Sequence, residues 1–276
     1  MGQKNMRNGF MRSSKRLLVV GVFLCSLVSA LSAQTLEIKS LDNPEPAQVL
    51  FVGNSYFYYN DSLHNHVNRL VQAQNIDLAE RIAYKSATIG GASLSHHDVA
   101  AHLEPGRLGL DTPFDLVILQ GGSGEPLRES RRRVFAQTAG QLSAVIRETG
   151  AEVALYMTPA YSSVHARYDP AMIDKISSLY IDVANEIGAL VIPVGLAFEE
   201  AYKRRPEMVL HKFFDGSHPE LEGTYLAACV VFATLYGQSP VGNSYTYFGE
   251  IDEQDALFLQ QVAQDVVVDF FGREKQ

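Results

Sequence analysis

The stretch that decides the fold is residues 47–55, which read Ala-Gln-Val-Leu-Phe-Val-Gly-Asn-Ser. The first seven residues form a short apolar run, typical of a strand that is buried on both faces. Gly53 permits a tight turn, and apolar residues at helical spacing follow over residues 61–74. A buried strand that leads through a turn toward a helix indicates a βαβ unit, and therefore a parallel sheet covered by helices.

Short apolar runs alternate with longer amphipathic stretches through the rest of the chain. The pattern predicts further strands at residues 82–87, 114–119, 152–157 and 189–194, and helices at 61–74, 125–148, 171–187, 219–236 and 253–271. Because strand–helix–strand crossovers are right-handed, these helices should cover both faces of the sheet. The sequence thus predicts an α/β fold with a five-stranded, mostly parallel sheet.

The topology also predicts where a functional site should lie. In open parallel sheets, functional groups gather beyond the carboxyl ends of the strands. The segments that follow Gly53, Ala87, Leu119 and Met157, and the loop that precedes Pro219, are therefore the places to search.

The first 33 residues differ from the rest of the chain. Five basic residues precede an apolar run over residues 17–28, small residues follow it, and no acidic residue is present. These features predict a secretory signal peptide over residues 1–33, a linker over 34–46 and one domain over 47–276. A retained membrane anchor is the alternative. The apolar run over residues 17–28 is, however, shorter than the roughly 18–20 apolar residues that a membrane span needs.

Charge limits the partners of the exported protein. The chain carries a net charge of −8, and removal of a signal with five basic and no acidic residues changes it to −13. Such an acidic protein repels nucleic acid and anionic membrane surfaces, so neither is expected as a partner, nor is a stable membrane anchor after cleavage. Export to the periplasm or the medium is expected. Cys229 alone would remain after cleavage, so no internal disulfide is expected.

Ser55 is the first candidate for chemistry, because it follows the first strand directly. A serine at a strand end presents its hydroxyl to the site, although a serine that only braces the turn is the alternative. A hydroxyl becomes an effective nucleophile when a positioned base removes its proton. The sequence must therefore also supply a histidine with an acidic companion.

Residues 214–219, Phe-Asp-Gly-Ser-His-Pro, supply that pair. The turn-forming Asp-Gly-Ser segment places Asp215 close to His218, and the carboxylate could orient the imidazole as in a catalytic triad. The alternative is that Asp215 caps the helix expected at 219–236 and that His218 is a surface residue.

The pairing of Leu-Phe-Val-Gly-Asn-Ser at 50–55 with Asp-Gly-Ser-His-Pro at 215–219 resembles the GDSL/SGNH hydrolase family, and looks closest to a branch of bacterial SGNH-like proteins. The resemblance covers residues 47–272. It implies a flavodoxin-like three-layer α/β/α sandwich. It also implies that Ser55 is the nucleophile, His218 its base and Asp215 the residue that orients the base, with no cofactor.

The resemblance further implies an oxyanion hole. The family's glycine after the second strand corresponds to Gly91, which would donate its N–H together with that of Ser55. The family's third block carries an asparagine whose side chain donates to the oxyanion, whereas Gln120 stands at the corresponding strand end here. Gln120 is the expected third donor. The alternatives are that its amide braces the loop of Ser55, and that Gly121 or Gly122 donates instead.

The sequence offers further candidate site residues. Asn54, Tyr56 and Tyr161 are expected to contact substrate, because they flank the nucleophile or lie in the loop after the fourth strand. The histidines at 64 and 66, and at 96, 97 and 102, have no third ligand at a recognisable spacing, so no metal site is predicted. The arginines at 131–133 have acidic neighbours and are expected to form a solvated helix face.

The sequence therefore predicts an exported carboxylic ester hydrolase: a serine esterase that works through an acyl-enzyme. By analogy with the family, the substrate is expected to be a small-molecule or glycan ester with a short acyl group, such as acetyl on carbohydrate. One alternative is a lipase or thioesterase that acts on longer acyl chains. Another is a degenerate relative that only binds a glycan, which the missing third-block asparagine motivates.

Overall fold

Five parallel strands form the centre of the fold in the computed structural model, which describes residues 1–2 and 35–274. Their order is β2-β1-β3-β4-β5, and every neighbouring pair is parallel, so the predicted α/β fold is confirmed. The strands are β1 (Gln48–Gly53), β2 (Ala83–Thr88), β3 (Leu116–Leu119), β4 (Glu152–Tyr156) and β5 (Leu190–Ile192). The predicted signal peptide lies outside the described residues, apart from Met1 and Gly2.

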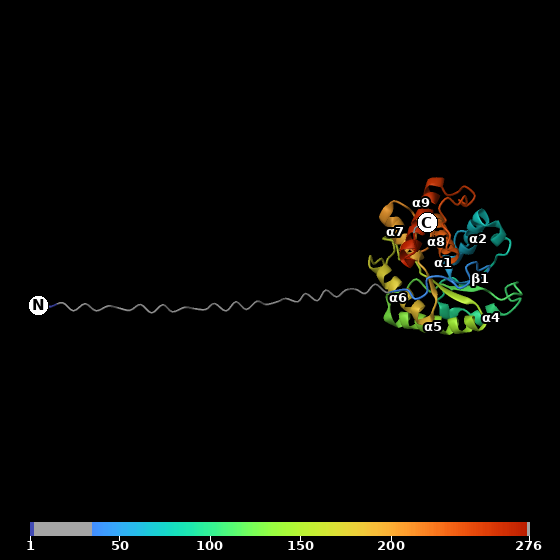
Figure 1. The fold of residues 1–276 in the computed structure, drawn as a ribbon, viewed down its shortest axis with the longest axis horizontal. Helices are drawn as coiled ribbons and strands as arrows, with labels where there is room; N and C mark the ends of the chain where they lie inside the picture. Colours follow the sequence, from blue (N-terminus) through green and yellow to red (C-terminus); the bar gives the residue numbers. More distant parts are fainter. Residues whose placement is uncertain (3–34, 275–276) are drawn as a thin grey trace. The chain divides into compact units, whose positions relative to one another are not determined.

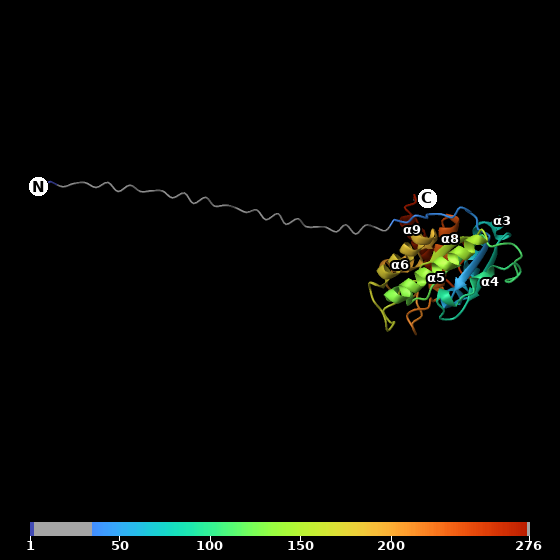
Figure 2. The ribbon, with the colours of Figure 1, turned by 90° about the horizontal axis from the view of Figure 1, so that it is seen from below.

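Helices cover both faces of this sheet and complete the three layers (Figure 1). On one face lie α4 (Val99–Leu103), α5 (Glu129–Glu148) and α6 (Met172–Ile187), and Figure 2 shows α5 running along the sheet. On the other face lie α2 (Leu63–Gln74), α7 (Val194–Arg204) and α8 (Leu221–Tyr236), with α9 (Glu253–Phe271) packed on α8. Short helices are α1 (Ser55–Tyr58) and α3 (Ile76–Ala79), and single 3₁₀ turns lie at Leu94–His96 and Glu125–Leu127.

Helix α8 is the most buried helix among the described residues. Every residue from Gly223 to Tyr236 is buried, because α2, α7 and α9 enclose the helix. A Cβ atom on Gly223 would lie 2.2 Å from the carbonyl oxygen of Leu210. Glycine therefore permits the preceding segment to pass close over the start of α8, and that segment leads into the loop of Asp215 and His218.

The structure corrects the predicted end of the fifth strand. Strand β5 ends at Ile192, Pro193 follows, and α7 begins at Val194, whereas the sequence analysis extended the strand to Val194 and expected no helix after it. Proline is favoured at the start of a helix because its missing N–H would have no partner there. Val194, Ala197, Phe198 and Ala201 are buried at the spacing of one helix face.

The segment expected as a linker instead packs on the domain. Leu36 and Leu41 are buried in the core, and the Glu37 N–H donates to Asn185 Oδ1 at 3.0 Å. Arg273 Nη2 donates to the carbonyl oxygen of Lys39 at 2.8 Å. The domain therefore begins near residue 35, because the two leucines provide apolar anchors that a linker would lack.

Candidate active site

Strand β1 delivers Ser55 to the carboxyl edge of the sheet. Val52 pairs with Ala87 and with Leu119, so the loops after β1, β2 and β3 emerge side by side. A Cβ atom on Gly53 would lie 2.5 Å from Gln120 Oε1, so only glycine fits at that position. Ser55 begins α1 and is 6% exposed.

Asn54 ties these three loops together. Its side-chain Oδ1 accepts from the Tyr56 N–H and caps α1. Its Nδ2 donates to the carbonyl oxygens of Ala92, at 2.9 Å, and Gly121, at 3.4 Å. Asn54 lines the cavity, but its amide hydrogen bonds are all made within the protein. Asn54 therefore has a structural role that fixes the Ser55 turn, and its contact with substrate stays a prediction.

A short closed loop carries the other two members of the predicted triad. His211 and Pro219 form an isolated antiparallel bridge, and the Lys212 N–H donates to the carbonyl oxygen of His218 at 2.8 Å. Lys212 Nζ also pairs with Glu220 Oε2 at 2.5 Å. These contacts fix both ends of the loop, so Asp215 and His218 hold a defined position relative to the start of α8.

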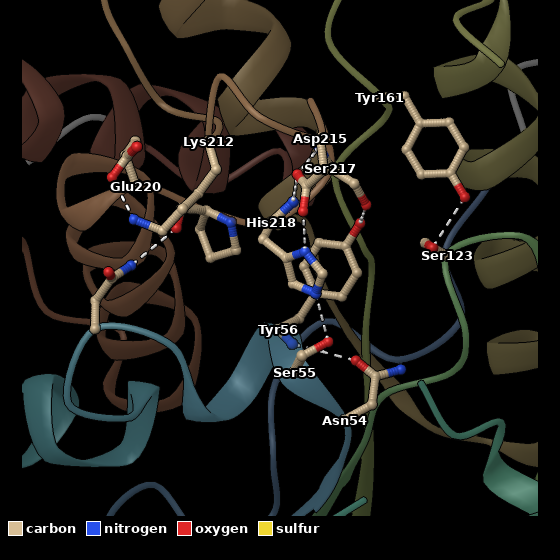
Figure 3. Close-up of polar contacts among 12 residues, drawn as sticks. Asn54, Ser55, Tyr56, Ser123, Tyr161, Lys212, Asp215, Ser217, His218 and Glu220 are labelled. Atoms are coloured by element: carbon tan, nitrogen blue, oxygen red, sulfur yellow. Dashed lines mark hydrogen bonds and ion pairs between the residues drawn. The ribbon is translucent and has the colours of Figure 1, made fainter. Parts of the chain in front are cut away.

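The structure brings Ser55, His218 and Asp215 into one hydrogen-bonded line (Figure 3). His218 Nδ1 lies 2.5 Å from Asp215 Oδ2, and His218 Nε2 lies 2.7 Å from Ser55 Oγ. An ionised carboxylate only accepts hydrogen bonds, so Nδ1 carries the proton and Nε2 is left to accept the Ser55 proton. This is the geometry that a serine nucleophile and its base require.

Hydrogen bonds keep the Asp215 carboxylate ionised. Burial raises the pKa of this group, but hydrogen bonds from the His218 side chain and from the N–H groups of Ser217 and His218 outweigh it, so the net pKa is lowered. Asp215 Oδ1 accepts both N–H groups, at 2.8 Å from Ser217 and 3.0 Å from His218. Asp215 therefore caps its own turn and not α8, whose N-cap is Glu220.

Aromatic rings hold the imidazole plane. The Tyr59 ring stacks on His218 with centroids 4.4 Å apart, and the Tyr56 ring lies 5.9 Å from it at a shallow angle. The Tyr56 hydroxyl is hydrogen-bonded to Ser217 Oγ at 2.8 Å. Tyr56 lines the cavity, where its contact with substrate stays a prediction, and its hydroxyl also positions the loop of His218.

Two of the three expected oxyanion donors face the same small cavity. Ser55 and Gly91 both line a cavity of about 240 Å³ together with His218. The hydrogen bonds among residues 35–274 leave the N–H groups of Ser55 and Gly91 without an acceptor. Gly91 has φ +70°, a conformation that favours glycine. The expected oxyanion role of these two N–H groups therefore stays a prediction.

The expected oxyanion role of Gln120 is not supported and is corrected here. Gln120 is 0% exposed and does not line the cavity. Its Oε1 accepts the Asn54 N–H at 2.9 Å, and its Nε2 donates to the carbonyl oxygen of Gly121. The Gln120 amide thus braces the Ser55 turn, as one of the two alternatives for this residue predicts. Gly122 is no substitute donor, since its N–H donates to Glu125 Oε2 at 2.5 Å.

Tyr161 also differs from expectation. It is 3% exposed, and its hydroxyl is hydrogen-bonded to Ser123 Oγ and to Arg167 Nη2, each at 3.0 Å. It borders a neighbouring cavity and does not line the one at Ser55. The Tyr161 hydroxyl holds Ser123 and Arg167, and both of these residues line the cavity of Ser55. The contribution of Tyr161 to the site is therefore indirect.

Three charged residues of the cavity were not expected there from the sequence: Glu125, Arg131 and Arg167. Glu125 is buried, which raises its pKa, although hydrogen bonds from Gly122 and Ser93 and the charge of Arg131 oppose the shift. The signal for Glu125 was its place a few residues after β3. Arg131 was expected on a solvated helix face, and nothing in the sequence pattern distinguishes Arg167.

Among residues 1–2 and 35–274, no group of three His, Cys, Asp or Glu side chains is placed to hold a metal ion.

In the same part of the chain, no helix combines the length and the hydropathy that a bilayer span requires.

Known structures share this architecture. The chain superposes on a DUF4886 family protein from Bacteroides uniformis with a TM-score of 0.64 and 20% identity, over 83% of this chain and 97% of that one. A candidate SGNH hydrolase from Slackia heliotrinireducens gives 0.53 and 22%, over 69% and 99%. The chain has the fold of the SGNH hydrolases.

A catalytic mutant of an acetylxylan esterase from Geobacillus stearothermophilus also has this SGNH-like fold, with a TM-score of 0.53 and 17% identity, over 72% of this chain and 96% of that one. A scan against models of protein families and a search of curated protein sequences give no match.

The bracing role of Gln120 predicts a loss of stability rather than a specific loss of rate. Gln120→Ala leaves the buried Asn54 N–H unpaired and opens a cavity, so the free energy of unfolding should fall by about 2–4 kcal/mol. The folded fraction should keep kcat within roughly tenfold, whereas loss of an oxyanion donor would cost about 10²–10³-fold. Urea unfolding and steady-state kinetics measure both, with the exposed Gln72→Ala as control. A large fall in kcat at unchanged stability would restore the oxyanion role.

Burial of His211 predicts acid sensitivity. The ring packs against Phe198 and Tyr202, and burial lowers the pKa of His211 to about 4, against opposing effects of the Ala160 backbone and the Asp215 charge. The unfolded chain binds this proton near pH 6.5 and the native chain does not, so stability falls as pH drops from 6.5 to 4.

The full effect on the free energy of unfolding is about 3 kcal/mol. Urea unfolding at pH 7 and pH 4 should show His211→Gln losing less stability than the wild type by about that amount. The exposed His96→Gln should follow the wild type. Equal losses in all three proteins would contradict the assignment.

Proposed function

We propose that this protein is a serine hydrolase that cleaves a carboxylic ester of short acyl chain through an acyl-enzyme. The observation that carries the proposal is the line Ser55–His218–Asp215, with 2.7 and 2.5 Å between successive polar atoms. A buried serine beside an imidazole whose far nitrogen faces a carboxylate is the arrangement that activates a hydroxyl.

The proposed reaction begins when His218 Nε2 takes the Ser55 proton as Ser55 Oγ attacks the ester carbonyl. The N–H groups of Ser55 and Gly91 donate to the oxyanion that forms. The imidazolium, stabilised by Asp215, then protonates the leaving alcohol, and the acyl group stays on Ser55. A water molecule, deprotonated by His218, attacks this acyl-enzyme and releases the acid.

The size of the cavity supports a short acyl group. Its volume of about 240 Å³ lies below the range of roughly 300–1,000 Å³ that is usual for ligand sites, so a long acyl chain does not fit within it. Two of the proteins with this fold are described as acetyl xylan esterases, and we extend acetylated carbohydrate to this chain as part of the proposal. The basic and apolar residues 1–33 support export to the periplasm or the medium.

The proposal predicts that Ser55→Ala abolishes turnover of a short ester. Hydrolysis of 4-nitrophenyl acetate should fall by at least about 10³-fold, because the Ser55 hydroxyl is the one hydrogen-bonded to His218 Nε2. The exposed Ser163→Ala should retain wild-type rates. The octanoyl ester should be a poorer substrate than the acetyl ester for the wild type.

Equal rates for Ser55→Ala and the wild type would exclude Ser55 as nucleophile. A preference for the octanoyl ester would favour the lipase-type alternative. Absence of turnover of every ester, including acetylated sugars, would favour the protein that only binds a glycan.

A further inference from the structure

Two guanidinium groups converge on the open side of the Ser55 cavity. Arg131 comes from the first turn of α5, and Arg167 from the loop after β4. A Cβ atom on Gly124 would lie 3.4 Å from Arg131 Nη1 and 3.5 Å from Arg167 Nη1. Both guanidinium groups therefore face the same small volume over Gly124, and all three residues line the cavity that contains Ser55 and His218.

No acidic side chain of the described residues forms an ion pair with either arginine. Glu125 also lines the cavity and its carboxylate feels the charge of Arg131, but it is 4% exposed, and its Oε2 accepts the Gly122 N–H. Two like charges that face one volume repel each other, and an anion between them would relieve that repulsion. The pair therefore provides more positive charge than the protein itself neutralises.

Arg167 is held in place before any ligand arrives. Its Nη2 donates to the Tyr161 hydroxyl at 3.0 Å, and its guanidinium carbon lies 5.3 Å from the centroid of that ring. The Tyr161 hydroxyl in turn contacts Ser123 Oγ, as Figure 3 shows. Because Tyr161 is buried, this contact restricts a side chain that would otherwise move freely, which lowers the entropic cost of binding an anion.

The positive charge of the two arginines is opposite in sign to the net charge of the chain. Residues 34–276 carry five fewer basic residues than the full chain and all 31 of its acidic ones, so the domain repels anions at long range. The two arginines place positive charge in the cavity of Ser55, opposite in sign to that net charge. Guanidinium groups match carboxylate oxygens in geometry as well as in charge.

We infer that the ester substrate carries a carboxylate that Arg131 and Arg167 bind beside the scissile bond. The inference rests on the proposed ester hydrolysis and narrows its substrate class. The carboxylate has two possible sources: the alcohol, as in an acylated uronic acid, or the acyl group, as in the half-ester of a dicarboxylic acid. Arg131 and Arg167 are then specificity-determining residues.

Two matched substrate pairs test the inference and separate the sources. Acetylated methyl glucuronide against acetylated methyl glucoside varies the alcohol, and 4-nitrophenyl hemisuccinate against 4-nitrophenyl butyrate varies the acyl group. In the pair that varies the true source of the carboxylate, kcat/KM should be at least about fivefold higher for the anionic ester than for the neutral one at low salt. This preference should shrink at high salt, because both arginines are exposed and their charges are screened.

Variants assign the preference to the arginine pair. Arg131→Gln should reduce the anionic-to-neutral ratio of kcat/KM toward one, and Arg131→Lys should keep part of it, because lysine retains the charge but not the planar fork. Arg133→Gln is the matched control: it lies on the same helix, pairs with Glu129 and does not line the cavity, so the ratio should stay at its wild-type value.

Equal kcat/KM for both members of each pair, or a ratio that survives Arg131→Gln, would overturn the inference. An equal fall in kcat/KM for neutral and anionic esters in Arg131→Gln would also overturn the inference, because it would indicate that Arg131 stabilises the oxyanion of every ester. Calorimetric titration with methyl glucuronide, methyl glucoside and succinate separates the two proposals. If no ester is hydrolysed but a carboxylate binds and Arg131→Gln weakens it, ester hydrolysis fails and the anion site stands.

Discussion

The hydrogen bond between His218 Nε2 and Ser55 Oγ joins residues that lie 163 positions apart, and most of the architecture serves that contact. Strand β1 and the Gly53 turn fix the serine, while the bridge between His211 and Pro219 fixes the loop of the histidine. Each side is anchored to a rigid layer, the sheet on one side and the buried helix α8 on the other. A shift of about 1 Å between them would cost much of the rate, so this rigidity has a functional reason.

Hydrogen bonds fix both the turn of Ser55 and the side of the cavity where Arg167 lies. Asn54 joins the loops after β1, β2 and β3 through its hydrogen bonds to Ala92 and Gly121. Gln120 Oε1 in turn accepts the Asn54 N–H. Ser123, Tyr161 and Arg167 continue the connection toward the loop after β4. Ser55, Arg131 and Arg167 line one cavity, and the contacts of Arg167 fix it at the same edge of the sheet as the nucleophile.

The candidate triad was expected from the resemblance to the SGNH hydrolases, because the local pattern at Asp215 and His218 also allowed a helix cap and a surface histidine. Apolar runs made β1, β3, β4 and β5 predictable, more clearly than β2 with its sequence Ala-Tyr-Lys-Ser-Ala-Thr. The orientation of Gln120 was not predictable, since a long amide points wherever its buried partner lies, and that partner is the Asn54 N–H. Nor was the meeting of Arg131 with Arg167. Arg133 pairs with Glu129 as the charge pattern of α5 predicts, whereas Arg131 turns toward a loop that has no periodic signal.

Covalent labelling reports directly whether His218 activates Ser55. The protein is treated with a fluorophosphonate, and the modified serine is located by mass spectrometry of its peptides. If His218 activates Ser55, a single adduct forms on Ser55 and is lost in His218→Asn, although Ser93, Ser123 and Ser217 line the same cavity. Absence of an adduct on the folded protein, or equal modification of Ser217 or Ser123, would contradict it.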